Sequence, residues 1–315
     1  MSSARTWSAR DFTVGDLAAR KAEQDLTVSV VLPARNEAAT IAGIVAACAE
    51  LSGVLVDELL VVDGASDDGT PKLAEDAGAR VLQDSDLLPA FGPAQGKGDA
   101  LWRSLAATTG DLVVFVDTDI RDPRPAFVTG LLGPLLHDPA VQFVKAFYER
   151  PLELGDVRRP TGGGRVTELL ARPLLNLFWP ALATVVQPLS GEYAGRRTLL
   201  ESLPFFTGYG VELGLLIDTL AAAGRGAIGQ VDLEHRVHRN QDLPSLSRMA
   251  FGIAQVAARR LADEGRLSAD ALPEAYLQFT RSPAGVTSST VRVPIQERPP
   301  MHSVQAAAAR SQATP

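Results

Sequence analysis

Two carboxylates, two residues apart, directly follow an apolar run and could hold a metal ion. The run covers residues 112–116, and Asp117, Thr118 and Asp119 come immediately after it. A continuous apolar run of this kind is typical of a strand buried in a parallel sheet, and residues two apart in an extended chain point to the same face. Asp117 and Asp119 could therefore share one Mg²⁺ or Mn²⁺ ion, which combines carboxylates with substrate phosphates. Acidic pairs also occur in solvated turns, so this motif needs support from elsewhere in the chain.

A lysine between two glycines could bind the phosphates of a nucleotide. Gly96, Lys97 and Gly98 open a segment with helical periodicity, and the N–H groups and dipole at a helix N-terminus attract anions. The segment is not a Walker A loop, because the spacing from Gly92 to Gly96 is one residue short and Gly98 stands where Ser or Thr is needed. A solvated surface lysine is the alternative interpretation.

Polar residues after the first two apolar strands could bind a base and a ribose. Ligands of open α/β sheets bind at the carboxyl ends of the strands. The candidates at those ends are Pro33, Ala34, Asn36, Glu37 and Asp63. Asn36 and Glu37 are equally compatible with a helix N-cap and a first-turn acid.

A triple glycine followed by Arg165 and Thr167 could bind an anionic second substrate. Glycines without a side chain allow close backbone approach to a ligand, and a guanidinium can bind a phosphate or carboxylate with two hydrogen bonds. Gly164, Arg165 and Thr167 are therefore candidates for the acceptor site. A flexible linker would also explain the glycines.

Two further segments offer charged groups. If residues 231–238 are extended, Arg236 and His238 lie on one face, and His238 could complete a metal site as a neutral imidazole. A histidine with a purely structural role is the alternative. Glu212 opens a helical stretch after Gly208–Gly210, where it could cap the helix or bind sugar hydroxyls.

The elements that must position these residues alternate between strand and helix. Apolar strands are predicted at 28–32, 58–63, 79–83, 112–117 and 141–147, and helical periodicity lies at 37–51, 70–77, 97–108 and 125–136. Such alternation predicts an α/β fold with a mostly parallel, doubly wound sheet. After residue 150 the pattern becomes largely helical, with one more strand at 231–237 and a helix at 244–262.

Composition excludes several classes of protein. The net charge of −7 and a pI near 5.2 argue against binding to nucleic acid through phosphate contacts. A single cysteine, Cys48, excludes an intrachain disulfide and fits a cytoplasmic protein. Residues 1–11 contain no apolar core of a signal peptide. Polar residues and prolines interrupt 169–189, so no membrane span is expected.

Several motifs together resemble the glucosyl-3-phosphoglycerate synthases, which are retaining glycosyltransferases with a GT-A fold. The resemblance covers about residues 27–262 and is most specific at 96–105 (GKGDALWRSL) and 161–169 (TGGGRVTEL). It implies transfer of glucose from UDP-glucose to 3-phosphoglycerate with Mg²⁺ or Mn²⁺ as cofactor, by a cytoplasmic homodimer. The chain differs from the common family pattern at Thr118, at Gly64–Ala65 and at Gln241.

The resemblance also implies roles for individual residues. Asp119 and His238 would bind the metal, and Glu212, Asp119 and Lys97 would serve catalysis. Gly164, Arg165, Thr167 and Asn240 would bind the acceptor. The donor would contact Pro33, Ala34, Asn36, Glu37, Asp63, Lys97, Asp117, Thr118, Asp119, Leu189, Tyr209, Glu212 and Arg236.

Four regions are expected from this interpretation: an N-terminal arm (1–26), a nucleotide-sugar-binding α/β region (27–150), a largely helical acceptor-binding region (151–282) and a disordered tail (283–315). Three other functions remain open. The first is mannosyl transfer from GDP-mannose to the same acceptor, and the second is a non-catalytic sugar-nucleotide sensor. The third, sugar nucleotidyl transfer, usually requires a glycine-rich loop after the first strand, which residues 33–37 lack.

Overall fold

A central sheet runs through the part of the chain that the computed structural model describes, residues 5–149, 152–154, 157–159, 164–236, 241–268, 272–282 and 285–313. The sheet has eight strands in the order β1-β11-β6-β9-β5-β2-β3-β4. Their bounds are β1 Arg5–Ser8, β2 Val28–Ala34, β3 Glu58–Asp63, β4 Arg80–Gln83, β5 Leu112–Phe115, β6 Phe143–Glu149, β9 Tyr193–Arg196 and β11 Ile228–His235.

All neighbouring strands in this sheet pair in parallel except around β9, which is antiparallel to both β5 and β6. The prediction of a mostly parallel α/β sheet is therefore confirmed. Strand β9 was not predicted, because a four-residue strand containing glycine and arginine carries no clear apolar alternation.

Alternate residues of the central strands bury their side chains on opposite faces of the sheet. Val30 and Leu32 of β2 belong to one core cluster, whereas Val31 belongs to the other. This period of two is the geometry expected of an extended chain. Two apolar faces require helices on both sides, which gives three layers.

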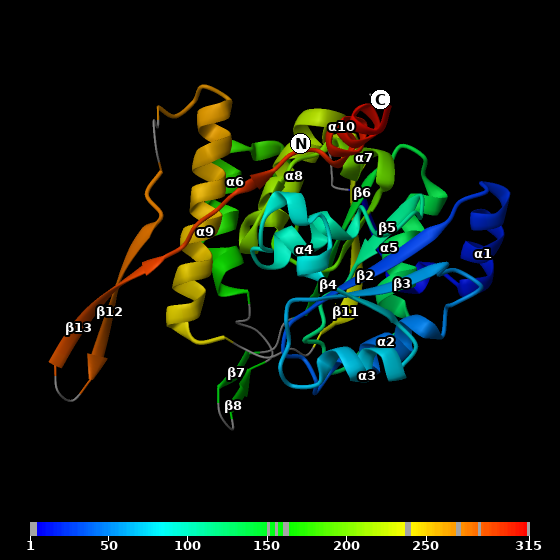
Figure 1. Ribbon diagram of the computed structural model, residues 1–315, viewed down its shortest axis with the longest axis horizontal. Helices are drawn as coiled ribbons and strands as arrows, with labels where there is room; N and C mark the ends of the chain where they lie inside the picture. Colours follow the sequence, from blue (N-terminus) through cyan, green and yellow to red (C-terminus); the bar gives the residue numbers. More distant parts are fainter. Residues whose placement is uncertain are drawn as a thin grey trace.

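Helices cover both faces of the sheet (Figure 1). Helices α1, α2, α3 and α5 contribute side chains to the first core cluster, and α4, α6, α7, α8, α9 and α10 contribute to the second. Their bounds are α1 Val14–Glu23, α2 Ile41–Ala49, α3 Thr70–Asp76, α4 Lys97–Ser104, α5 Ala126–His137, α6 Arg172–Phe178, α7 Arg197–Ser202, α8 Val211–Ala223, α9 Leu243–Asp263 and α10 Met301–Ala313.

The predicted regions share this sheet. The N-terminal arm contains α1 and also supplies β1, which pairs with β11 at the edge of the sheet. Strands β9 and β11 come from beyond residue 150 and lie beside β5 and β6.

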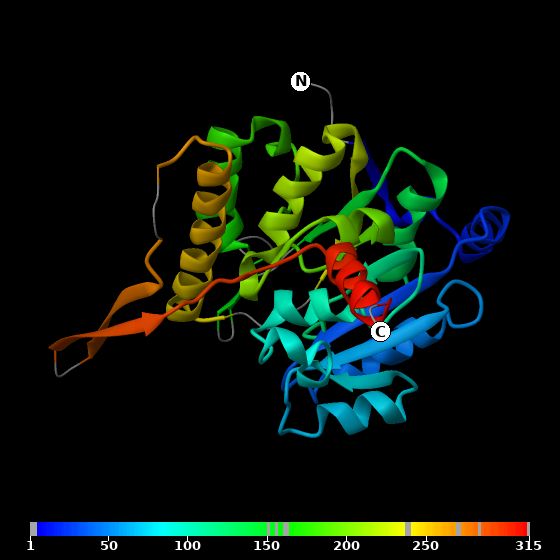
Figure 2. The same ribbon diagram turned by 45° about the horizontal axis from the view of Figure 1, so that its top comes forward.

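The prediction of a disordered tail from residue 283 is wrong for the residues that the structure describes. Strand β12 (Ala275–Ser282) pairs with β13 (Gly285–Arg292) in a hairpin that projects from the body of the molecule (Figures 1 and 2). The chain then returns across the body through β14 (Glu297–Arg298), which pairs with β10 (Phe205–Phe206), and ends in α10. Buried Arg298 and Met301 anchor this return, and composition does not reveal such long-range contacts.

The remaining strands form a short hairpin, β7 (Leu152–Leu154) with β8 (Val157–Arg159). No helix within the described ranges is long and apolar enough to cross a membrane.

Candidate active site

Lys97, the first residue of α4, lies between two carboxylates at the carboxyl end of the sheet. Its Nζ is 2.5 Å from Asp117 Oδ1 and 2.7 Å from Glu212 Oε1. Burial alone would lower the pKa of Lys97, but the two carboxylates outweigh burial and raise the pKa well above its ordinary value. The lysine therefore carries a positive charge at neutral pH.

Asp117 and Asp119 contact the same nitrogen of Arg236. Arg236 Nη2 lies 3.4 Å from Asp117 Oδ2 and also donates to Asp119 Oδ1. The two carboxylates therefore share one face of the chain, as their spacing predicted. Gly191 packs directly beneath Asp117, since a Cβ at Gly191 would lie 1.9 Å from Asp117 Oδ2.

Arg236 is buried among groups that the sequence analysis did not assign to the site. Its Nη1 donates to Tyr148 Oη at 2.7 Å and lies 3.2 Å from Glu192 Oε1. Tyr148 in turn donates to Glu192 Oε2 at 2.6 Å. Burial raises the pKa of Glu192, and the charge of Arg236 opposes that shift. Arg236 was a candidate from the sequence, and Glu192 could have been found as an acid in a segment with no other charged residue, 188–195.

Lys145 is a second buried lysine near the site. It lies in β6, where its Nζ donates to the Ser190 carbonyl at 2.5 Å and lies 4.5 Å from the centre of the Tyr193 ring. Burial lowers the pKa of Lys145 to about 7. A lysine in the middle of the apolar run 141–147 was a signal in the sequence that could have pointed to this residue.

The loops after β2 and β3 are joined to each other beside this centre. Asn36 adopts a φ of 56°, a left-handed conformation that asparagine tolerates. Its N–H donates to Ser66 Oγ at 2.8 Å, and its Oδ1 accepts from Asp67 N–H at 3.0 Å. Glu37 N–H donates to Thr70 Oγ1 at 2.9 Å. Asn36 therefore orders the two loops.

Asp63 and Thr118 lie at the ends of β3 and β5. Asp63 is fully buried; its Oδ2 accepts from Ser66 N–H at 2.9 Å, and its Oδ1 has no hydrogen-bond partner in the described residues. Buried polar atoms are normally paired, so a ligand hydroxyl is a suitable partner for Oδ1. Thr118 donates to the Pro33 carbonyl at 2.8 Å and so ties β5 to the end of β2, beside Ala34.

The candidate acceptor residues begin the helical segment before α6. Gly164 has a φ of 73°, and Arg165 Nη2 donates to the Gln241 carbonyl at 2.8 Å. Thr167 is buried at the start of a π-helical turn, Thr167–Ala171. Arg165 therefore contacts Gln241, the residue that follows Asn240 in the sequence.

Leu189 and Tyr209 differ in their surroundings. Leu189 is half-buried against the second core cluster, whereas Tyr209 is mostly exposed in the turn Gly208–Gly210 just before Glu212.

His238 and Asn240 lie outside the described residues. No group of three or more His, Cys, Asp and Glu is placed to hold a metal among the residues that are described.

Asp117 and Asp119 nevertheless fit a hard divalent cation that also binds a substrate. Mg²⁺ usually takes one or two carboxylates plus substrate phosphates and water, rather than a complete protein cage. A mostly parallel sheet with this acid pair and a buried lysine at its carboxyl edge defines a glycosyltransferase of the GT-A fold.

Comparison with known proteins supports that class. Residues 29–209 match the family described as glycosyl transferase family 2. The chain is 46% identical over 299 residues to glucosyl-3-phosphoglycerate synthase of Petrotoga mobilis, with 92% of this chain and 91% of that protein covered. It is 48% identical to the enzyme of the same name from Mycobacterium tuberculosis, with 94% and 91% covered.

Two solved structures are similar over almost the whole chain. Mannosyl-3-phosphoglycerate synthase from Rubrobacter xylanophilus has a TM-score of 0.88 at 46% identity, covering 95% of this chain and 96% of that one. Glucosyl-3-phosphoglycerate synthase from Mycobacterium tuberculosis, solved with Mn²⁺, UDP-glucose and phosphoglyceric acid, has a TM-score of 0.84 at 46% identity, covering 96% and 99%. The chain belongs to glycosyl transferase family 2 and, within it, to the family of the glucosyl-3-phosphoglycerate synthases, so the resemblance and the GT-A fold seen in the sequence are confirmed.

Proposed function

We propose that this protein transfers glucose from UDP-glucose to 3-phosphoglycerate with retention of configuration, giving glucosyl-3-phosphoglycerate. The observation that carries the proposal is the contact of Lys97 with both Asp117 and Glu212 at the carboxyl edge of the sheet. Relatives of that name, 46–48% identical over nine-tenths of the chain, support the substrate assignment.

Lys97 stabilises the leaving group. A positively charged ammonium at the N-terminus of α4 is suited to the negative charge that grows on a departing diphosphate. Arg236 adds a second buried cation beside Asp117 and Asp119. Asp119 and His238 would hold Mg²⁺ or Mn²⁺, and the bound ion would supply further charge neutralisation.

The donor contacts the loops after β2 and β3. Asp63 Oδ1 lacks a partner among the described residues and is suited to a hydroxyl or N–H of the uridine. Pro33, Ala34, Asn36 and Glu37 form the adjoining wall, and Thr118 holds Pro33 in register. Leu189, Tyr209 and Glu212 border the sugar, whose hydroxyls donate to the Glu212 carboxylate.

The acceptor binds at Gly164, Arg165, Thr167 and Asn240. The guanidinium of Arg165 and the hydroxyl of Thr167 bind the phosphate and carboxylate of 3-phosphoglycerate and orient its 2-hydroxyl. Glu212 is engaged by Lys97 and Glu192 by Arg236, so neither serves as a free nucleophile. In the proposed route the acceptor hydroxyl attacks the anomeric carbon on the face from which the diphosphate leaves, and its proton passes to an oxygen of that diphosphate. Trapping a glycosyl-enzyme at Glu212 would contradict this route.

A cytoplasmic homodimer is part of the same proposal. The hairpin β12–β13 carries Leu277 and Phe279 on one face, 54% and 65% exposed. Large apolar side chains on a projecting hairpin are suited to an interface. The single cysteine, Cys48, is buried and fits a reducing compartment. Light scattering of the purified protein should give twice the mass of the 33.4 kDa chain; a monomer would contradict the homodimer.

Release of nucleoside diphosphate tests the donor. We would compare UDP-glucose, GDP-glucose and GDP-mannose, each with Mg²⁺ and with or without 3-phosphoglycerate. The proposal expects acceptor-dependent release that is strongest with UDP-glucose. The similarity to the Rubrobacter mannosyl-3-phosphoglycerate synthase makes GDP-mannose the second candidate, and strongest release from it would establish mannosyl transfer instead.

A further inference from the structure

The segment between β13 and α10 crosses the two loops that precede Lys97 and Glu212. We call residues 296–301 the C-terminal strap. In Figures 1 and 2 the chain runs from the β12–β13 hairpin back over the body to α10 along this path. The buried polar groups of the strap bind these two loops. The contacts described below involve neither the central sheet nor the acceptor residues.

The strap is bound to α4 through a buried ion pair. Arg298 Nε donates to Asp99 Oδ1 at 2.8 Å and its Nη2 donates to Asp99 Oδ2 at 2.7 Å. Both residues are almost completely buried, at 2% and 0% exposed. Asp99 lies two residues after Lys97, in the first turn of α4. A bidentate pair in such surroundings fixes orientation as well as distance.

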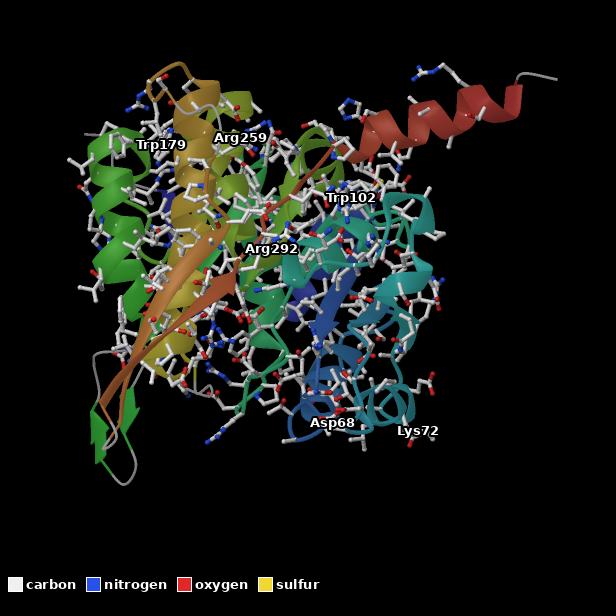
Figure 3. The ribbon with its side chains drawn as sticks, turned by 60° about the vertical axis from the view of Figure 1, so that its left-hand side comes forward. Asp68, Lys72, Trp102, Trp179, Arg259 and Arg292 are labelled. Carbon is white, nitrogen blue, oxygen red and sulfur yellow. The ribbon has the colours of Figure 1, made fainter. Side chains whose placement is uncertain are left out.

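The same pair fixes the loop that leads into Lys97. Arg298 Nη1 donates to the Phe91 carbonyl at 2.8 Å, and Asp99 Oδ2 accepts from Gln95 N–H at 2.9 Å. Trp102, labelled in Figure 3, donates from Nε1 to the Pro299 carbonyl at 2.8 Å. Arg103, a buried residue near the end of α4, donates to the Gly92 carbonyl at 2.7 Å and so also holds this loop.

The other side of the strap is bound to the loop that leads into Glu212. Phe205 and Phe206 pair with Arg298 and Glu297 as antiparallel strands. Thr207 N–H donates to the Gln296 carbonyl at 2.8 Å, and Gln296 N–H donates to Thr207 Oγ1 at 3.0 Å.

The two loops also meet directly beneath the strap. Gly208 N–H donates to the Gln95 carbonyl at 3.2 Å, and Gln95 Nε2 donates to Gln296 Oε1 at 2.9 Å. Gly98 packs so closely that a Cβ there would lie 1.9 Å from the Phe206 carbonyl oxygen. The strap and the two loops thus form one unit of three segments joined by hydrogen bonds. The two loops lead into Lys97 and Glu212.

We propose that the C-terminal strap is a positioning element of the donor site, in which Arg298 and Asp99 set the distance between Lys97 and Glu212. Arg298 touches no substrate; it acts through the two loops. The inference rests on the proposed function for the roles of Lys97 and Glu212. It adds that glucosyl transfer requires the strap, a segment far from Lys97 and Glu212 in the sequence.

Kinetics of Arg298→Lys test the proposal. Lysine keeps the charge but cannot form the bidentate pair, so Lys97 and Glu212 lose their spacing while the buried carboxylate keeps a cation. We expect kcat to fall about 10- to 100-fold, since displacements near 1 Å have such effects, with a raised KM for UDP-glucose. The KM for 3-phosphoglycerate should change less than about twofold, because Arg165 lies outside the unit.

Arg197→Met is the matched control. Arg197 also donates to two buried backbone carbonyls, those of Gly110, just before β5, and of Leu105, just after α4, both away from the site. This variant should lower the melting temperature while kcat stays within about twofold of wild type. If both variants lose the same stability and both keep kcat within about twofold of wild type, the strap is only structural and the proposal fails.

Hydrogen exchange separates failure of this inference from failure of the proposed function. In Arg298→Lys, amides of both residues 91–98 and residues 206–212 should exchange faster than in wild type, and in Arg197→Met they should not. This result needs no turnover, so it stands even if the wild type transfers no glucose. Faster exchange in the strap alone, with both loops unchanged, would overturn the proposal.

Discussion

The Lys97 ammonium lies 2.7 Å from the Glu212 carboxylate, and the pair joins the first turn of α4 to the first turn of α8. Both side chains are largely buried, at 17% and 6% exposed. Since Lys97 also contacts Asp117, one ammonium connects the acid pair after β5 with the carboxylate that we assign to the sugar.

Replacing Lys97 by methionine should abolish most turnover. The substitution keeps the length of the side chain but removes the charge that stabilises the leaving diphosphate, and it leaves Glu212 buried without its cation. We expect kcat to fall about 100- to 1,000-fold in a UDP-release assay. Lys72→Met is the control, since Lys72 is exposed on α3 (Figure 3) and forms its ion pair with Asp76 in the same helix. A Lys97→Met enzyme with more than about a tenth of wild-type kcat would contradict the role of Lys97.

Removing the Asp119 carboxylate should uncouple UDP binding from the metal. In wild type, calorimetry should record tighter binding of UDP when Mn²⁺ is present, because the cation would bind to both the protein and the nucleotide through oxygen ligands. In Asp119→Asn we expect most of that enhancement to disappear, at least about tenfold in Kd. Asp76→Asn, on the exposed face of α3, should retain it. Equal enhancement in Asp119→Asn and wild type would remove Asp119 from the metal site.

A single methyl group at Gly191 should displace Asp117. The added Cβ would lie 1.9 Å from Asp117 Oδ2, so the carboxylate must leave its contact with Lys97. We expect Gly191→Ala to remain folded and to lose about tenfold or more in kcat. Gly226→Ala is matched, because its Cβ would meet nothing within 4 Å. Unchanged kinetics of Gly191→Ala would argue that Asp117 has no role in positioning.

Lys145 should make the stability of the protein depend on pH. Burial lowers the pKa of Lys145 to about 7 from 10.5. Between these values the unfolded chain binds a proton that the folded protein has lost, so raising the pH favours the folded state. The unfolding free energy of wild type should therefore rise relative to that of Lys145→Met from about pH 7 to about pH 9, by at most about 1.4 kcal/mol per pH unit. Denaturant titrations in which the difference between the two proteins stays constant would contradict this prediction.

Local sequence patterns predicted the strands and helices whose own apolar residues are buried in the core. The apolar runs at 28–32 and 58–63 lie within β2 and β3, and the helical periodicity at 244–262 lies within α9. The carboxyl ends of parallel strands meet at one edge, so Asp117 and Asp119 could be placed there from sequence position. Lys97 could be grouped with them because it opens a helix, whose N-terminus attracts phosphate.

Elements stabilised by distant partners could not be predicted in this way. Strand β14 is ordered by Arg298 pairing with Asp99, and no pattern within residues 283–315 reveals a partner on α4. The cluster of Tyr148 and Glu192 around Arg236 likewise requires the antiparallel strand β9, which brings Glu192 beside β6.

The central claim is tested most directly by the structure of the product. Purified protein would be incubated with UDP-glucose, D-3-phosphoglycerate and Mn²⁺, and the product characterised by mass spectrometry and by the anomeric proton resonance in NMR. The proposal predicts one hexose joined to phosphoglycerate through an α linkage, and UDP in equal amount. A β-linked product would contradict retention of configuration, and UDP formed without any glycosylated phosphoglycerate would contradict the assignment of the acceptor.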